Sequence, residues 1–149
     1  MDLILWRHAE AEDAYPDLSR ALTGKGRKQA SRIADWLNPR LPEDIRIIAS
    51  PALRTVQTAQ ALGREFEVAD ACAPGATAAG MLEAVGWPDS TRPVLIVGHQ
   101  PVLGRIAARL LFGQEAELSI RKAAVWWFHG RDRSESEVAL RAVVNPDWL

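Results

Sequence analysis

The stretch Leu3-Ile4-Leu5-Trp6-Arg7-His8 sets the organisation of this 149-residue chain. Four apolar residues in succession are typical of a short strand that is buried on both faces of a sheet. The run stops at a guanidinium and an imidazole, which therefore follow the carboxyl end of the strand. Because ligands of open α/β sheets bind at that edge, the segment predicts both a core strand and a site.

Two later segments repeat this arrangement. Residues 45–49 read as a strand that leads into Ser50-Pro51-Ala52-Leu53-Arg54, and the aliphatic residues 94–97 lead into Gly98-His99-Gln100-Pro101. The sequence thus offers two arginines and two histidines at three strand ends: Arg7, His8, Arg54 and His99.

The segments between these strands carry helical periodicity. Thr23 is a suitable N-cap for a helix that ends near residues 38–39, with an apolar face at i, i+3, i+4 and i+7. That face consists of Ala30, Ile33, Ala34 and Leu37. A helix is also expected from Pro101 to Gly113, where glycine is a favoured terminator.

The middle of the chain predicts three further elements. Ser50 is expected to cap a second helix with Pro51 as its first residue, a position where proline is well tolerated. The inner stripe of that helix is expected to be Val56, Ala59, Gly63 and Phe66. A short strand at residues 66–71 and a helix at 76–85 should follow.

The end of the chain has a different pattern. Residues 123–128 and 138–144 are two β-type runs around the polar residues 130–136, which predicts a hairpin. With the alternating strands and helices before it, this pattern predicts a single domain, residues 1–149, of the α/β class. We expect a three-layer α/β/α sandwich with a mostly parallel central sheet and a C-terminal β-hairpin.

Composition limits the range of partners and compartments. The net charge of −1 argues against nucleic acid, whose partners usually present a basic face. Cys72 is the single cysteine, which excludes an intramolecular disulfide and a cysteine-based zinc site. No stretch is apolar for long enough to span a bilayer or act as a signal peptide. We therefore expect a cytoplasmic protein without a nucleic-acid or membrane partner.

The four strand-end side chains suit a phosphoryl group. Arginine pairs with two oxygens at once and keeps its charge at any working pH. Neutral imidazole is a good nucleophile near pH 7 and can hold the transferred group covalently. We assign the nucleophile to His8, beside Arg7. His99, at a strand-to-helix turn, is expected to donate a hydrogen bond to a phosphoryl oxygen.

These residues resemble a known family. Residues 5–11 are similar to the signature of the histidine phosphatase superfamily, in its phosphoglycerate-mutase-like branch. The blocks at residues 22–26, 50–59 and 98–101 follow in the family's order. The short chain and residues 17–20 (Asp-Leu-Ser-Arg) resemble the small phosphohistidine phosphatases of the SixA type.

The resemblance implies a phosphate pocket and a covalent route. Its residues would be Arg7, His8, Arg54 and His99, with His8 transiently phosphorylated and Arg20 as an outer cation at the pocket mouth. No metal and no organic cofactor are implied. The implied substrate is a phosphorylated protein, with phosphohistidine as the phosphorylated residue.

Two departures from the family pattern bear on the substrate. Ala9 stands where the superfamily often has glycine, although alanine should be tolerated. Residues 71–77 contain no carboxylate where many members of the branch have a proton-donating glutamate, and Glu83 is expected on a helix surface. Since a protonated imidazole leaves phosphorus readily, this absence favours phosphohistidine over sugar phosphates.

Other readings of the same residues remain open. The protein could be a phosphomonoesterase that acts on a small phosphomonoester, or a non-catalytic module that binds phosphorylated partners. A mutase-like phosphotransferase is less favoured, because the chain lacks both the acid and the insertions that enclose a small substrate. A metal hydrolase is disfavoured because two arginines would repel the cation. His129, on the expected hairpin, is interpreted as an edge residue outside the site.

Overall fold

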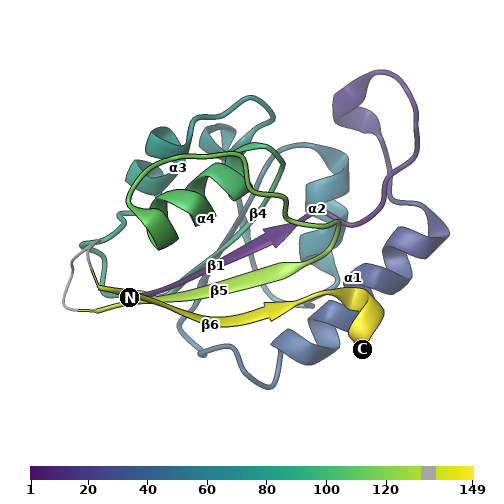
Figure 1. The fold of residues 1–149 in the computed structure, drawn as a ribbon. Coiled ribbons are helices and arrows are strands. Elements are labelled where there is room, and N and C mark those ends of the chain that lie inside the picture. The colour runs from purple at the N-terminus through teal and green to yellow at the C-terminus, as the bar shows by residue number, and fades with distance from the viewer. Residues whose placement is uncertain (132–136) are drawn as a thin grey trace.

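A six-stranded sheet with the order β3-β2-β4-β1-β5-β6 forms the centre of the molecule (Figure 1). The computed structural model describes residues 1–131 and 137–149. The strands are β1 (Asp2–Arg7), β2 (Arg46–Ala49), β3 (Glu67–Val68), β4 (Val94–Gly98), β5 (Val125–Gly130) and β6 (Val138–Val144). Neighbours among β3, β2, β4 and β1 pair in parallel, whereas β5 is antiparallel to β1 and to β6.

This topology confirms the predicted class, a mostly parallel sheet with a C-terminal β5–β6 hairpin. Of the turn expected at residues 130–136, positions 132–136 lie outside the described residues. The helices are α1 (Gly24–Leu37), α2 (Leu53–Gln60), α3 (Ala78–Ala84) and α4 (Val102–Phe112). Within the described ranges, no helix is both long and apolar enough to cross a membrane.

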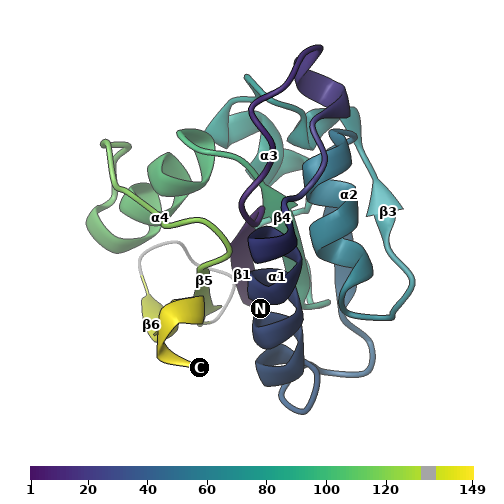
Figure 2. The ribbon, with the colours of Figure 1, turned by 90° about the vertical axis from the view of Figure 1, so that its right-hand side faces the viewer.

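Successive residues of a strand pack into two different hydrophobic cores, one on each face of the sheet. Leu3 and Leu5 of β1 pack in the core that holds the buried residues of α3 and α4. Ile4 and Trp6 pack in the core that holds α1 and part of α2. Figure 2 shows α1 and α2 on one side of the sheet and α4 on the other, which is the expected three-layer arrangement.

The helix α1 confirms its predicted face and cap. Its buried residues include the four apolar residues of the predicted stripe. The Thr23 hydroxyl oxygen accepts a hydrogen bond from the backbone N–H of Gly26 at 2.9 Å. The prediction for α4 also holds, since Gly113 ends that helix in the left-handed region at φ 80°.

The predicted start of α2 is wrong, and of its predicted inner stripe only Ala59 lies on the buried face of the helix. Ala52 is the N-cap and Leu53 the first helical residue, because the Ser50 hydroxyl binds the N–H of Ala52 in a turn before the helix. The buried face carries Arg54, Thr55, Thr58 and Ala59, whereas Val56 is half-buried and Gly63 lies beyond the helix end. This inner face is polar because it forms one wall of the candidate site.

Two neighbouring elements are shorter than expected. The strand predicted at residues 66–71 is limited to the two residues of β3, and Asp70–Cys72 forms a 3₁₀ turn. The helix predicted at residues 76–85 spans Ala78–Ala84, and Thr77 caps it by accepting from the N–H of Gly80 at 3.0 Å.

The start of α1 lies against the chain that follows His8. A Cβ atom added at Gly26 would lie 2.0 Å from the carbonyl oxygen of Glu10, so only glycine fits there. At Gly24, two residues earlier in the same turn, an added Cβ would meet nothing within 4 Å. The close approach at Gly26 therefore fixes the position of α1 relative to the segment after the first strand.

We predict that Gly26→Ala lowers the free energy of unfolding by about 1–3 kcal/mol, because the backbone of Glu10 must move to admit the methyl group. Gly24→Ala is the matched control and should stay within about 0.5 kcal/mol of wild type. Urea denaturation followed by circular dichroism measures both. Equal stability of the two variants would contradict the close packing at Gly26.

Candidate active site

The ladder of parallel strands brings three polar residues to one edge of the sheet. Arg7 pairs with Gly98 across β1 and β4, and Ala49 pairs with Val97 across β2 and β4. The ladder continues one residue further, since the N–H of His8 donates to Gly98 O and the N–H of Ser50 donates to Val97 O, both at 3.1 Å. His8, Ser50 and His99 consequently follow adjacent strand ends, and the rings of His8 and His99 lie with centroids 5.4 Å apart.

His8 is held in one ring orientation and one tautomer. Its side chain is buried, with 8% exposed. The Nδ1–H donates to the carbonyl oxygen of Ala9 at 2.7 Å. Because a carbonyl can only accept, the neutral ring carries its proton on Nδ1 and a free lone pair on Nε2. That is the form of imidazole that can attack phosphorus.

The turn at Ser50, just before α2, positions His99. Its Nε2 lies 2.7 Å from the hydroxyl oxygen of Ser50. Because the Ser50 hydroxyl oxygen already accepts from the N–H of Ala52, we assign the hydroxyl as the donor to Nε2, and this assignment puts the ring proton on Nδ1. The Nδ1 atom is buried and has no hydrogen-bond partner.

Arg54 enters the site from the buried face of α2. Its Nη1 donates to the backbone oxygen of Asp17 at 2.9 Å, and its Nη2 pairs with the Asp17 carboxylate at 3.1 Å. Thr58, one turn later, accepts from the N–H of Ala9 at 3.1 Å and donates to the carbonyl of Arg54 at 2.7 Å. The helix is thereby tied to the backbone next to His8.

Asp17 is a site residue that the sequence did not single out. It lies in a 3₁₀ turn, Asp17–Ser19, within the segment before α1 that extends past the arrowhead end of β1 (Figure 1). Burial would raise the pKa of the Asp17 carboxyl, but hydrogen bonds and charge from Arg54 and Arg20 hold that pKa below its ordinary value. Asp17 is therefore an ionised partner of the arginines and not a proton donor at neutral pH.

Arg20 lies at the margin of this cluster. Its Nε donates to the backbone oxygen of Glu12 at 2.7 Å, and its Nη1 pairs with Asp17 at 3.3 Å. Its positive charge contributes to lowering the pKa of His8, so it acts on the site across space. Its position at the mouth of the phosphate pocket and its contact with phosphate remain predictions.

Arg7 faces the segment before β5. Its Nη1 donates to the carbonyl of Ile120 at 2.9 Å, and its backbone N–H donates to Ala124 O at 3.2 Å. These contacts fix the guanidinium beside the strand end.

The site contains buried hydrogen-bond donors that have no partner. In the described part of the chain, four buried side-chain polar atoms lack one, and three of them belong to the predicted pocket: Arg7 Nε, Arg54 Nε and His99 Nδ1. The fourth is the indole nitrogen of Trp87 in the core. Each unpaired buried group costs about 1–3 kcal/mol, so their concentration at one edge indicates a site built for an anionic acceptor.

Burial keeps both imidazoles neutral. It is the largest cause that lowers the pKa of His8 to about 4; the hydrogen bond to Ala9 acts in the opposite direction, and the charges of Arg54, Arg7 and Arg20 lower it further. Burial also lowers the pKa of His99 to about 3, with Arg54 as the largest charged contributor. At pH 7 the cluster thus combines neutral rings with positive guanidinium groups.

Three other sequence expectations can be compared with the structure. Ala9 is not among the non-glycine residues with positive φ, so the absence of glycine there causes no strain. Glu83 is exposed on α3 as expected. His129 is exposed and pairs with Asp2 at the start of β1, away from the strand ends that carry the site. Its predicted edge position is wrong, because β5 lies between β1 and the outer strand β6.

Comparison with known proteins places this geometry in a family. The profile of the Histidine phosphatase superfamily (branch 1) matches residues 3–74. A protein of Haemophilus influenzae described as a phosphohistidine phosphatase SixA homolog is 30% identical over 141 residues, which cover 84% of this chain and 85% of the relative. The chain belongs to the histidine phosphatase superfamily. It is accordingly a hydrolase of the phosphatase class.

This phosphatase is also similar to characterised SixA proteins. Phosphohistidine phosphatase SixA of Escherichia coli is 27% identical over 124 residues, which cover 76% of each chain. A structure of the protein histidine phosphatase SixA complexed with tungstate superimposes with a TM-score of 0.82 at 26% identity, covering 99% of this chain and 98% of the other. The structural similarity therefore extends past residue 74 and includes the segment that carries His99.

We predict that His8 and His99 stay neutral far below pH 6.5. In a ¹H–¹³C NMR titration, their ring resonances should shift with midpoints near pH 4 for His8 and near pH 3 for His99. Between pH 6.5 and 4 the unfolded chain takes up protons that the folded chain excludes, so the free energy of unfolding should fall as the solution is acidified. His8→Asn and His99→Asn assign the resonances and should each flatten this dependence. Titration of either ring near pH 6.5 would contradict the burial of the pair.

Proposed function

We propose that the protein is a cofactor-independent phosphatase that removes the phosphoryl group from phosphohistidine in a protein through a phospho-His8 intermediate. The observation that carries this proposal is the set of unpartnered buried donors, Arg7 Nε, Arg54 Nε and His99 Nδ1, around a neutral imidazole with its lone pair on Nε2. A phosphoryl group supplies several acceptor oxygens for such donors and a phosphorus atom for the nucleophile.

The first step transfers the phosphoryl group to the enzyme. His8 Nε2 forms a bond to phosphorus while the bond from phosphorus to the substrate nitrogen breaks. The substrate ring enters protonated on its second nitrogen and leaves as neutral imidazole, and His8, which keeps its proton on Nδ1, becomes a phosphorylated imidazolium. Arg7, Arg54 and the Nδ1–H of His99 donate to the phosphoryl oxygens, on which negative charge is distributed in the transition state. The leaving imidazole needs no strong enzyme acid, which agrees with the ionised state of Asp17.

The second step restores the enzyme. Water attacks phosphorus, and the bond between phosphorus and His8 Nε2 breaks. Both protons of the water leave with the product as dihydrogen phosphate, and His8 returns to its neutral form with the proton on Nδ1. The hydrogen bond from Nδ1 to Ala9 holds the ring in place through both steps. A ring that is already oriented for attack loses less entropy on reaching the transition state, which lowers the activation barrier.

Similarity to SixA proteins supports phosphohistidine as the substrate class. The relatives from Haemophilus influenzae and Escherichia coli are described as phosphohistidine phosphatases or homologues of one. The tungstate that accompanies the similar SixA structure is a tetrahedral oxyanion of the shape that the proposed pocket would hold.

We predict a graded loss of activity across three variants. His8→Asn should abolish turnover while it retains part of the affinity for tungstate, because the arginines remain. Arg54→Gln should lower kcat on the order of 10²-fold, the typical effect of losing one donor to a charged transition state. His129→Asn is the matched histidine control and should leave kcat unchanged. Steady-state kinetics with a phosphohistidine peptide measures all three, and wild-type turnover by His8→Asn would contradict the mechanism.

We also predict that the wild-type enzyme prefers phosphohistidine to phosphate monoesters. Its kcat/KM should be higher for a phosphohistidine peptide than for sugar phosphates, since alkoxides are poor leaving groups without an acid. Mass spectrometry after an alkaline quench should detect an acid-labile phosphoryl adduct on His8. The opposite preference would indicate a small-molecule phosphomonoesterase, and binding of phosphate without an adduct or turnover would indicate a non-catalytic module.

A further inference from the structure

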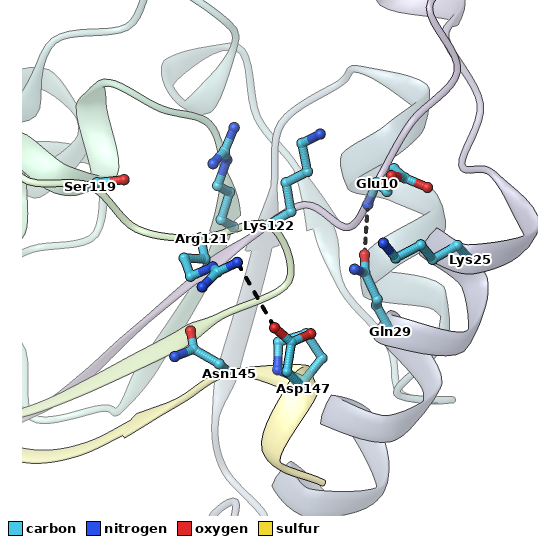
Figure 3. Close-up of a pocket in the computed structure, with 10 residues that line it drawn as sticks. Glu10, Lys25, Gln29, Ser119, Arg121, Lys122, Asn145 and Asp147 are labelled. Atoms are coloured by element: carbon cyan, nitrogen blue, oxygen red, sulfur yellow. Dashed lines mark hydrogen bonds and ion pairs between the residues drawn. The ribbon is translucent and has the colours of Figure 1, made fainter.

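A polar pocket of about 360 Å³ lies beside the candidate active site and shares Arg7 with it. His8, Arg54 and His99 do not line this pocket. Figure 3 shows its walls: Lys25 and Gln29 come from α1, and Arg121 and Lys122 come from the segment before β5. The pocket is thus adjacent to the reacting centre but is a separate feature of the surface.

Positive charge dominates the lining. Its cations are Arg7, Lys25, Arg121 and Lys122, against the carboxylates of Glu10 and Asp147. Two of the three lysines of the whole sequence lie here. The lining therefore carries an excess of positive charge, although the net charge of the whole chain is −1.

The carboxylates in the pocket are already engaged, whereas the lysines are not. Glu10 accepts from the Thr23 hydroxyl at 2.7 Å, and Asp147 lies 3.9 Å from Arg121 (Figure 3). Within the described ranges, Lys25 and Lys122 form no hydrogen bond or ion pair with their side chains. Their two charges are available to a ligand.

The turn that carries Lys122 is held in a strained conformation. Ala123 has φ 61°, the one positive φ of a non-glycine residue in the described chain, which is an unfavourable conformation for alanine. The strand with the nucleophile keeps it there. Ala123 N–H donates to His8 O at 3.1 Å, and the Trp6 indole donates to Ala123 O at 2.9 Å. The position of Lys122 is therefore coupled directly to the backbone of His8.

We propose that this pocket binds acidic side chains that flank the phosphorylated residue of a protein substrate. This inference rests on the proposed function and names the sequence context that the enzyme selects. Lysines are point charges on flexible stems, which suit carboxylates at varying positions along a peptide. Of the two arginines that line the pocket, Arg7 is already assigned to the phosphoryl group in the active site, and Arg121 lies 3.9 Å from the carboxylate of Asp147.

The test uses two phosphohistidine peptides that differ only in having Glu or Gln at the flanking positions, together with phosphoimidazole as a substrate without flanks. The wild-type kcat/KM should be roughly 3- to 10-fold higher for the Glu peptide, the size expected of two exposed ion pairs. Lys25→Gln/Lys122→Gln should abolish this preference and leave phosphoimidazole hydrolysis unchanged. Lys28→Gln, on the same helix but outside the pocket, is the matched control and should keep the preference. High salt should reduce the preference of the wild type.

Each alternative result has a separate meaning. Equal kcat/KM for the two peptides, or a preference that survives in the double variant, would overturn the docking role. A lysine-dependent preference for small bisphosphorylated compounds, without one for the Glu peptide, would assign the pocket to a second phosphate and also overturn it. Failure of the wild type to hydrolyse phosphoimidazole would count against the proposed function instead. In that case, fluorescence anisotropy with the unphosphorylated Glu and Gln peptides would still decide whether the pocket selects acidic chains.

Discussion

The parallel pairing of β1, β4 and β2 is the constraint on which the site depends. The hydrogen bonds from His8 to Gly98 and from Ser50 to Val97 extend the sheet by one residue at two strand ends. They leave His8 and His99 on neighbouring backbones with their rings 5.4 Å apart. Since the core on both faces fixes the register of these strands, packing far from the site determines the distance between the two imidazoles.

The site is maintained at a cost in stability. Partner-less donors on Arg7, Arg54 and His99 are buried, and α2 turns a polar face inward where an apolar one would pack more favourably. Neighbouring hydrogen bonds limit this cost, because Thr58 joins α2 to Ala9 and Asp17 binds the outer nitrogens of Arg54. An apolar core at this position would give a larger free energy of unfolding. The polar site has a smaller one, and its donors are already oriented before a ligand binds.

The sequence was most informative where one physical rule decided the local structure. Aliphatic runs predicted β1 and β4, and a 3.6-residue period with a Thr23 cap predicted α1. The 3.6-residue period is a poor guide at α2. Hydrophobic periodicity favours Val56 as an inner residue, whereas the buried face of this helix is mostly polar because it faces the candidate site. Local sequence favours Ser50 as a helix cap, whereas its hydroxyl forms a hydrogen bond with His99, which is 49 residues away.

Some residues of the candidate site can be predicted from the sequence, and others cannot. The sequence identifies four of these residues because each lies at a strand end or within a family motif: Arg7, His8, Arg54 and His99. It does not identify Asp17, since nothing local indicates that its carboxylate reaches a guanidinium 37 residues further along. The sequence also does not reveal the charged pocket that Arg7 lines, because Lys25 and Lys122 are far apart in the sequence and come together only in the folded chain.

The central claim is that His8, His99, Arg7 and Arg54 surround a single phosphoryl-sized anion. A crystal structure of this protein with vanadate or tungstate tests it most directly. The account predicts one oxyanion with His8 Nε2 facing its central atom and with His99 Nδ1 and both guanidinium groups within hydrogen-bond distance of its oxygens. An anion bound elsewhere, or one that contacts either histidine without the two arginines, would contradict it.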